Sequence, residues 1–279
     1  MEDSIRTELG RFVRESPDNR FPDSDEPYFD EPLVGFAVAD DPIFSDYKRI
    51  IGEFHRTPHE VMTGVLGEAG RAVSVISWIL PITRQTRESN RREAMYPSRA
   101  WAQTRNFGEQ FNAALRRYLV AWLEGHGQQA VAPQLAVNWQ EHRATPVGIA
   151  STWSERHAAY AAGLGTFSLN DALITPRGIA HRCGSVVTDL PLAPSPRTYP
   201  HFRHNCLFHR EGSCGLCIGR CPVGALSREG HDKTLCSQYV YGTVVSAVGE
   251  QFGVQHTGCG LCQTKVPCEG QIPTGARQA

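Results

Sequence analysis

Residues 206–226, "CLFHREGSCGLCIGRCPVGAL", hold four cysteines within sixteen residues, and the last of the four directly precedes a proline. Thiols at this density hold zinc, form disulfides or ligate iron–sulfur clusters, and their spacing helps to separate these uses. The C-x2-C-x3-C-P motif over 214–222 matches the last three positions of the bacterial ferredoxin run C-x2-C-x2-C-x3-C-P. Glu211 stands at the first position of that run, so Cys206 would have to reach in over a longer loop. The spacing therefore favours iron–sulfur chemistry.

Four more cysteines follow downstream, at positions 236, 259, 262 and 268. Eight thiols are the number that two [4Fe–4S] clusters need, and in two-cluster ferredoxins the last cysteine of a run ligates the other cluster. The spacing thus predicts two sets of ligands: Cys206, Cys214, Cys217 and Cys268 for cluster 1, and Cys221, Cys236, Cys259 and Cys262 for cluster 2. Such sharing would bring the two clusters close together, which suits electron transfer between them.

Zinc is the main alternative. A tetrahedral four-thiolate zinc site would combine the C-x2-C pairs at 214–217 and 259–262. This arrangement leaves the other four cysteines of the region without a role, and it does not explain the Cys-Pro sequence at 221–222. A structural module with two zinc ions would use all eight thiols but would gain nothing from the C-x2-C-x3-C-P order.

The overall composition is that of a globular protein, with 279 residues, 41% hydrophobic residues, 20% charged residues and a formal net charge of −1. This charge balance indicates neither a nucleic-acid nor a membrane partner. The first twelve residues, "MEDSIRTELGRF", lack the apolar core of a secretory signal, and the longest apolar run, "AVSVISWILPI" (72–82), is too short to cross a bilayer. We therefore expect a cytoplasmic protein, a setting in which structural disulfides are rare. Cys183 has no spaced partner, so we expect a small buried hydrophobic residue there.

Predicted strands and helices alternate over the first 190 residues, which indicates an α+β, α/β-like main domain. Apolar runs predict strands at 32–39, 72–80, 128–133, 171–175 and 184–190. Apolar periodicity and capping patterns predict helices near 5–13, over 41–54, around 111–125 and within 151–165. Four prolines in "PLAPSPRTYP" (191–200) mark a boundary, so we predict a main domain over 1–195 and a cysteine-rich domain over 196–279.

An arginine-rich stretch covers residues 83–105, with six arginines against Glu88 and Glu93. This excess of positive charge could bind a phosphate-bearing partner, such as tRNA, a phosphorylated metabolite or a phosphate-bearing cofactor. A solvated, mobile loop explains the composition equally well, because runs of charge are commonly solvated.

Segments outside the cysteine motifs carry a family resemblance. The segment "AGLGTFSLNDALITPRGIAHRCGSVVTDLPL" (162–192) resembles the "AGLGWIGKN…L…GS…TDLPL" segment of the epoxyqueuosine reductase family, a relative of the reductive dehalogenases. "GRAVSVISWILP" (70–81) resembles a strand near the start of these proteins. "LCSQYVYG" (235–242) stands where the family has a lone cluster cysteine followed by a tyrosine.

This resemblance implies a nitroreductase-like α+β domain that binds base-off cobalamin, followed by a ferredoxin-like module with two [4Fe–4S] clusters. Gly163, Gly165 and Ser185 would lie on the cobalamin side. The clusters would receive electrons from a low-potential donor of the ferredoxin or flavodoxin type and would pass them to the cobalt. The substrate would be either epoxyqueuosine in tRNA or a small molecule.

Three departures from the family pattern bear on this expectation. The family's D-T-x-P-x-x-E-R motif supplies an aspartate thought to donate a proton, whereas this chain reads "IASTWSER" (149–156) and has no acid before Glu155. Glu155, His157 and Tyr160 could take that role, although a helix cap, a core-edge histidine and a packing tyrosine are the structural alternatives. Cys268 follows its predecessor after five residues and precedes Glu269, where the family has C-x3-C-P. The sequence also lacks the C-terminal helical repeats that many family members use against tRNA.

We therefore predict an iron–sulfur oxidoreductase of the epoxyqueuosine reductase-like type, which relays electrons through two [4Fe–4S] clusters to cobalamin and reduces an unidentified substrate. The alternative is a ferredoxin-type electron-transfer protein that serves a partner enzyme and has no cobalamin chemistry of its own. In that case the first 190 residues would be a docking domain.

Overall fold

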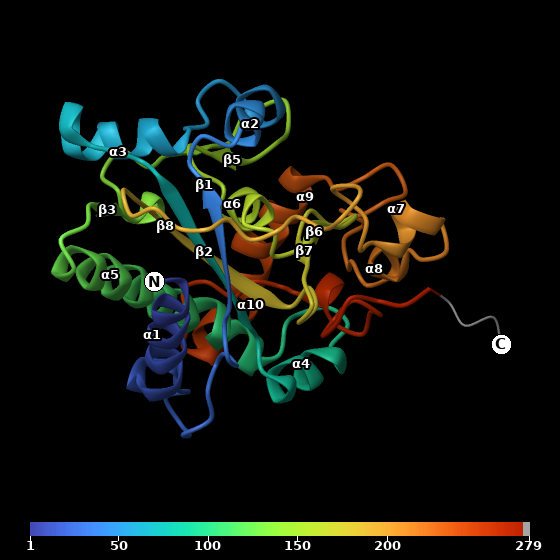
Figure 1. Ribbon diagram of the computed structural model, residues 1–279. Helices are drawn as coiled ribbons and strands as arrows, with labels where there is room; N and C mark the ends of the chain where they lie inside the picture. The colour runs from blue at the N-terminus through green and yellow to red at the C-terminus, as the bar shows by residue number, and fades with distance from the viewer. Residues whose placement is uncertain (276–279) are drawn as a thin grey trace.

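A four-stranded antiparallel sheet forms the centre of the computed structural model, which describes residues 1–275 (Figure 1). The strand order is β1-β2-β8-β3, with bounds Leu33–Val38, Ser74–Pro81, His181–Thr188 and Ala130–Val131. Every residue of β2 is buried, because helices cover both faces of the sheet. A strand in this position can be apolar on both sides, which explains the largely apolar run that predicted it, interrupted only by the buried Ser74 and Ser77.

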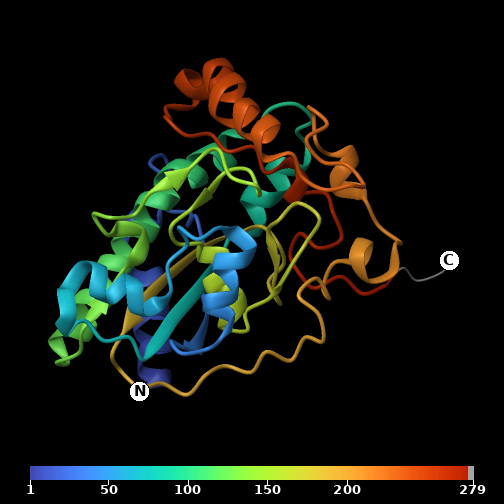
Figure 2. The same cartoon turned by 90° about the horizontal axis from the view of Figure 1, so that it is seen from above.

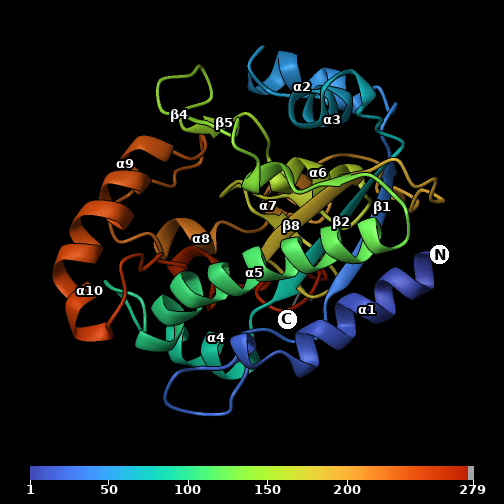
Figure 3. The same cartoon turned by 90° about the vertical axis from the view of Figure 1, so that its left-hand side faces the viewer.

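Helices pack on the two faces of this sheet and divide the main core into two clusters. On one face lie α1 (Glu2–Glu15) and α5 (Arg99–Gly125), whose apolar side chains meet Phe36 and Trp78. On the other face lie α2 (Ile43–Ile51), α3 (Pro58–Leu66) and α6 (Glu155–Ala161), packed against Val75 and Ile79. Figure 3 shows these two sets of helices on opposite sides of the sheet. The alternation of strand side chains between the two faces is the reason for this division.

The remaining secondary structure of the main portion consists of short pieces. Helix α4 (Arg84–Arg91) precedes α5, and Ser98 caps the N-terminus of α5 by accepting a hydrogen bond from the Trp101 backbone N–H. Two small antiparallel sheets, each of two strands that are two residues long, pair β4 (Glu141–His142) with β5 (Ala150–Ser151) and β6 (Thr166–Phe167) with β7 (Leu173–Ile174). Short 3₁₀ turns are η1 (Pro17–Asn19), η2 (Gly67–Ala69) and η3 (Pro133–Leu135).

Residues 191–200 form an extended segment that leads from the sheet to the cysteine-rich portion, and Figure 2 shows it in golden orange. Ser195 fixes this segment to β1, because its hydroxyl and its backbone N–H bond the backbone of Phe36. The cysteine-rich portion then forms α7 (Leu207–Glu211), α8 (Leu216–Gly219), α9 (Lys233–Gln238), the π-helical turn η4 (Tyr239–Val244), α10 (Val245–Phe252) and the 3₁₀ turn η5 (Leu261–Gln263). Among residues 1–275 no helix combines the length and apolarity needed to cross a membrane.

The structure corrects the sequence-based prediction in two places. Helix α3 was not predicted, although Thr57 and Glu60 form a complete capping box at its start. The arginine-rich stretch is no mobile loop: residues 84–91 are α4, and residues 99–105 begin α5. Helix α4 could not be recognised from apolar periodicity, because its sequence has no apolar stripe and it packs through arginines and Asn90.

Candidate functional site

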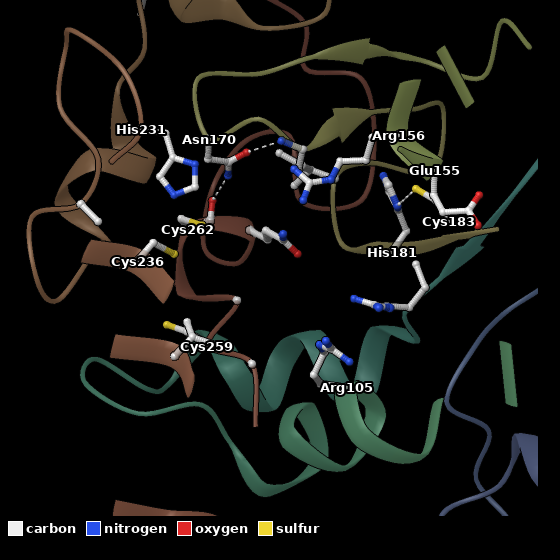
Figure 4. A pocket seen from close by; sticks show the side chains of 18 of the residues that line it. Arg105, Glu155, Arg156, Asn170, His181, Cys183, His231, Cys236, Cys259 and Cys262 are labelled. Atoms are coloured by element: carbon white, nitrogen blue, oxygen red, sulfur yellow. Dashed lines mark hydrogen bonds between the residues drawn. The ribbon is translucent and has the colours of Figure 1, made fainter. Parts of the chain in front are cut away.

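A cavity of about 410 Å³ lies between the sheet and the cysteine-rich portion. Four cysteines line one side of it, and we call them the second cysteine group: Cys221, Cys236, Cys259 and Cys262. They come from three separate places in the chain, namely the end of α8, helix α9 and the turn η5. Figure 4 shows Cys236, Cys259 and Cys262 on the same side of the cavity. The fold thus gathers thiols that are far apart in sequence.

The other four cysteines of this portion line a second, smaller cavity, and we call them the first cysteine group: Cys206, Cys214, Cys217 and Cys268. This cavity is enclosed by apolar side chains, among them Ile174 and Ile179 at the end of the hairpin that leads into β8. The two cavities therefore sort the eight cysteines into the same two sets that the spacing predicts.

The thiols within each group interact electrostatically. Burial and the nearby Cys206 and Cys214 raise the pKa of Cys217 to about 11. Burial raises the pKa of Cys259 to about 11 as well, and Cys236 adds to the effect. Four crowded thiols repel one another as thiolates, so they need bound cations to ionise together.

The two groups also adjoin each other. Burial raises the pKa of Cys262 well above that of a free thiol, and Cys217 contributes to this shift together with other thiols of the second group. Cys217 belongs to the first group, so the two groups lie near enough for their thiols to interact electrostatically. Any pair of cofactors held by the two groups would be neighbours.

The single zinc site that combines the two C-x2-C pairs does not fit this arrangement. A four-thiolate zinc ion lies about 2.3 Å from each of its four sulfur atoms. The proposed zinc set is split, because Cys214 and Cys217 line the smaller cavity while Cys259 and Cys262 line the larger one. Over the described range 1–275, no three side chains of histidine, cysteine, aspartate or glutamate are grouped closely enough to hold a single metal ion.

Helix α4 holds the loop that carries Cys268. Glu269 is only 3% exposed, and it accepts hydrogen bonds from Arg91 Nε at 2.7 Å and from the Lys265 backbone N–H at 2.8 Å. The Cys268 carbonyl accepts a hydrogen bond from the Ile179 backbone N–H at 2.9 Å, which ties the loop to the strand region. Glu269, which replaces the family's proline, is thus a structural anchor that the arginine-rich stretch binds.

A second arginine holds the loop of Cys259 and Cys262. Arg220 Nε donates hydrogen bonds to the carbonyl oxygens of Leu261 and Thr264, at 3.2 and 3.1 Å, and its Nη1 donates to the Glu93 carbonyl at 2.8 Å. Arg220 therefore links the helix that precedes Cys221 to the loop of the second group and to the α4 region.

Glu155 reaches the wall of the large cavity. Its Oε2 accepts a hydrogen bond from Ser185 Oγ at 2.6 Å, and its Oε1 lies 3.3 Å from Nη2 of the buried Arg116. Burial raises the pKa of this carboxyl group. The side chain makes no cap at the start of α6, so the capping role considered for it is wrong. Ser185 is fully buried and also accepts a hydrogen bond from Trp153 Nε1 at 2.9 Å.

His157 and Tyr160 do not line the large cavity. His157 Nδ1 lies 2.8 Å from Ser154 Oγ, its ring packs against Tyr47 and Phe167, and burial lowers its pKa to about 3. Tyr160 also packs against Phe167. Of the three predicted proton donors, Glu155 alone lies on the cavity wall.

Gly163 and Gly165 lie away from the cavity and allow close backbone packing. A Cβ atom at Gly163, where φ is +73°, would lie 2.7 Å from the Pro196 carbonyl oxygen, and one at Gly165 would lie 2.5 Å from the Ile174 carbonyl oxygen. Their visible role is therefore steric, and a contact with cobalamin stays a prediction from the resemblance.

Sequence analysis included Arg105 in the arginine-rich stretch, but it missed the other polar side chains that α5 and β8 contribute to the site. Arg105 and Arg182 line the cavity, and Glu109 binds both Arg182 and the buried Arg116. Burial alone would raise the pKa of Glu109, but the two arginines lower it to about 2. The seven-residue spacing from Glu109 to Arg116 places both on one face of a helix, which was the available signal.

Cys183 corrects a further expectation. It packs partly into the second core cluster, as a small apolar residue would, but it is only half-buried and lines the large cavity. Its Sγ lies 3.6 Å from His181 Nδ1. Burial raises the pKa of this thiol to about 12, which keeps it protonated.

Comparisons with known proteins give the following matches. No protein-family model matches the chain. A segment of 119 residues is 30% identical to the epoxyqueuosine reductase of Bacillus anthracis and covers 41% of this chain and 29% of that enzyme. A solved epoxyqueuosine reductase matches with a TM-score of 0.55 and 18% identity, over 96% of this chain and 66% of that chain. A reductive dehalogenase whose structure suggests a mechanism for B12-dependent dehalogenation matches with a TM-score of 0.54 and 16% identity, over 87% of this chain and 30% of that chain.

These matches confirm the predicted resemblance to epoxyqueuosine reductases and reductive dehalogenases, and they confirm the mixed α+β fold class. The chain spans just under two thirds of the solved epoxyqueuosine reductase and less than a third of the curated enzyme and of the dehalogenase.

Proposed function

We propose that the chain is an iron–sulfur oxidoreductase that passes electrons through two [4Fe–4S] clusters to a substrate reduced in the large cavity. The observation that carries this proposal is the sorting of eight cysteines into two adjoining groups of four. Similarity to an epoxyqueuosine reductase supports a reductase. The second group lines the cavity in which a substrate would bind, so electrons would reach the substrate from that side.

The thiols suit such clusters for a chemical reason. Burial raises the pKa of Cys217 in the first group and of Cys259 in the second, so bound cationic iron would stabilise these thiols in their thiolate form. The first group would ligate cluster 1 and the second group cluster 2. We propose with this that residues 196–279 act as a ferredoxin-like module on the main domain over 1–195.

We further propose that the large cavity binds cobalamin beside the second group. One buried polar atom of its wall residues, Trp139 Nε1, has no hydrogen-bond partner within residues 1–275, so an acceptor such as the amide oxygen of a ligand would satisfy it. Trp101 and Trp153 add flat apolar surface on the same wall. Bound cobalamin supplies a cobalt that, as Co(I), is a strong nucleophile or electron donor.

Glu155 is the proposed proton donor. Burial raises its pKa, so its carboxyl group holds a proton more readily than a solvated one. Ser185 Oγ donates a hydrogen bond to Oε2 and Arg116 Nη2 lies 3.3 Å from Oε1, so both contacts orient the carboxyl group from which a proton would leave toward the substrate. Glu155 would thereby take over the role of the aspartate that the family carries before this helix.

Metal analysis tests the clusters. Protein purified without oxygen should contain about eight iron and eight sulfide per chain, as two [4Fe–4S] clusters require. It should be brown and should give an EPR signal after reduction with dithionite. A colourless, EPR-silent preparation, or one that contains zinc in place of iron, would refute the proposal.

A titration with cobalamin tests the second part. Cluster-replete protein should retain cobalamin on gel filtration and change its visible spectrum as the base-off form binds. Retention without a spectral change, or no retention, would leave the ferredoxin-type electron carrier as the better function. A carrier has no need of a cavity walled by Glu155 and three tryptophans, and this observation favours the enzyme.

Epoxyqueuosine in tRNA is a second candidate substrate, favoured by the 119-residue match. The arginine-rich stretch gives it no added support, because four of its six arginines are used in ion pairs within the protein: Arg84, Arg87, Arg91 and Arg99. Reduction of epoxyqueuosine-containing tRNA by dithionite-reduced protein would establish this activity, and no conversion under conditions in which the clusters are intact would exclude it.

A further inference from the structure

Two arginines of the large cavity have no carboxylate partner within residues 1–275. Arg105 projects from α5 into the cavity, and the side-chain hydrogen bond it makes there is to Tyr241 Oη at 3.4 Å. Arg156, on the opposite wall, donates from Nη1 to the Asp171 backbone carbonyl at 2.7 Å. Figure 4 shows both guanidinium groups facing the space beside the cysteines. An arginine so placed holds charge-assisted donors ready for an anion.

The surrounding charges leave the cavity positive. Arg182 lines the cavity and is paired with Glu109, which also binds Arg116, and Arg116 in turn lies near Glu155. Four arginines thus meet two glutamates. Lys233 and His231, which lines the cavity, both pair with the carboxylate of Asp171, so this group of side chains has no excess of negative charge. The proximity of Arg182 lowers the pKa of Arg105, and the nearby Glu109 offsets only part of this effect.

We infer that the cavity takes a small substrate that carries a carboxylate or phosphate group, bound by Arg105 and Arg156 with its reducible part toward the second cysteine group. This inference rests on the proposed function in one respect only, namely that the reducible part of the substrate faces the second cysteine group. A guanidinium group binds carboxylates and phosphates through two parallel hydrogen bonds, and the indole N–H of Trp139 is a further free donor on the wall. A cavity of about 410 Å³ has the size of a small-molecule site.

The anion could belong to the substrate or to the phosphate of a bound corrinoid, and the inference commits to the substrate. The test compares benzoate with benzamide, which have the same shape but differ in charge. Isothermal titration on cluster-replete, cobalamin-free protein should show benzoate binding at least about tenfold more tightly, since a charge-assisted hydrogen bond contributes this much. Inorganic phosphate should compete with benzoate for the same site.

Variants locate the effect. Arg105→Gln should lose the preference for benzoate, Arg105→Lys should keep part of it, and Arg84→Gln should bind as the unchanged protein does, because Arg84 is exposed and paired with Glu88. Iron content and the EPR spectrum of each variant report on the clusters separately. If the iron content and the EPR spectrum of a variant are normal, the loss of benzoate binding contradicts the anion site alone and leaves the proposed function standing.

Three results would overturn the inference. One is equal affinity for benzoate and benzamide, or no binding of either. Another is an unchanged preference in Arg105→Gln protein. The third is loss of the benzoate site when cobalamin is added, which would assign the anion site to the phosphate of the cofactor.

Discussion

Arg91 on α4 and Glu269 in the last loop form a part-buried ion pair, with Arg91 Nε 2.7 Å from Glu269 Oε2. The two residues lie 178 positions apart in the chain, and Glu269 directly follows Cys268. The pair therefore joins the main portion of the protein to the loop that completes the first cysteine group.

Replacing this carboxylate should loosen the Cys268 loop. Glu269→Gln keeps the volume but loses the charged hydrogen bonds, so the free energy of unfolding should fall by about 1–3 kcal/mol. Iron bound at the first group should become easier to remove by a chelator. Denaturant unfolding and chelation rates measure the two effects. Arg84→Gln, which breaks an exposed pair, is the control and should change stability by less than about 1 kcal/mol.

Cysteine substitutions should separate ligands from bystanders. Cys262→Ser should lower the iron content from about eight to about four per chain, because one [4Fe–4S] cluster loses a ligand. Cys183→Ser is the matched control: it lines the same cavity but belongs to neither group, so its iron content should stay full. Equal iron loss in the two variants would contradict the assignment of the second group.

Stability should fall in acid because three histidines are buried: His55, His157 and His181. Burial lowers the pKa of His55 and His181 to about 4 from an ordinary value of 6.5. Between these values the unfolded chain takes up protons that the folded chain refuses, so the stabilisation is complete above pH 6.5 and is lost as the pH falls. Each buried histidine should contribute up to about 2 kcal/mol of this loss between pH 7 and pH 5.

Urea unfolding at several pH values checks the acid effect. His55→Gln should have a shallower dependence on pH than the unchanged protein, whereas His126→Gln, at an exposed position, should follow the unchanged protein. Both comparisons are made at the same cluster content, so acid loss of iron affects all samples alike. Parallel curves for His55→Gln and the unchanged protein would contradict the prediction.

The glycines of the "AGLG" segment should act through packing. Gly165→Ala would place a methyl group 2.5 Å from the Ile174 carbonyl oxygen, so the backbone must shift and the free energy of unfolding should fall by about 1–3 kcal/mol. Cobalamin affinity should change little in the folded variant. A large loss of affinity at unchanged stability would instead support a contact between this glycine and the cofactor.

The sequence predicted the sheet and the grouping of cysteines for different reasons. The strand at 72–80 is apolar on both faces, so it was recognisable without knowing its neighbours. The cysteine groups followed from spacing, because cluster ligation shares ligands between runs in a regular order. The division into domains at 195, the cluster ligands and the cobalamin contacts stay predictions.

The polar wall of the cavity was not predictable in the same way. Arg105, Glu109 and Arg116 read as ordinary charges on an amphipathic helix, and only the contact of α5 with β8 turns them inward. The capping pattern of residues 152–155 does not predict the orientation of Glu155, because its side chain is held by tertiary contacts with Ser185 and Arg116.

Helix α5 serves two sides of the molecule at once. Its apolar side chains, such as Phe111 and Leu115, fill the core, while Arg105 lines the cavity and Glu109 binds Arg182 of the cavity wall. One residue inserted between Arg105 and Phe111 would rotate the part of the helix that follows by about 100°. The apolar side chains of that part would then turn away from the core, and polar side chains would turn toward it.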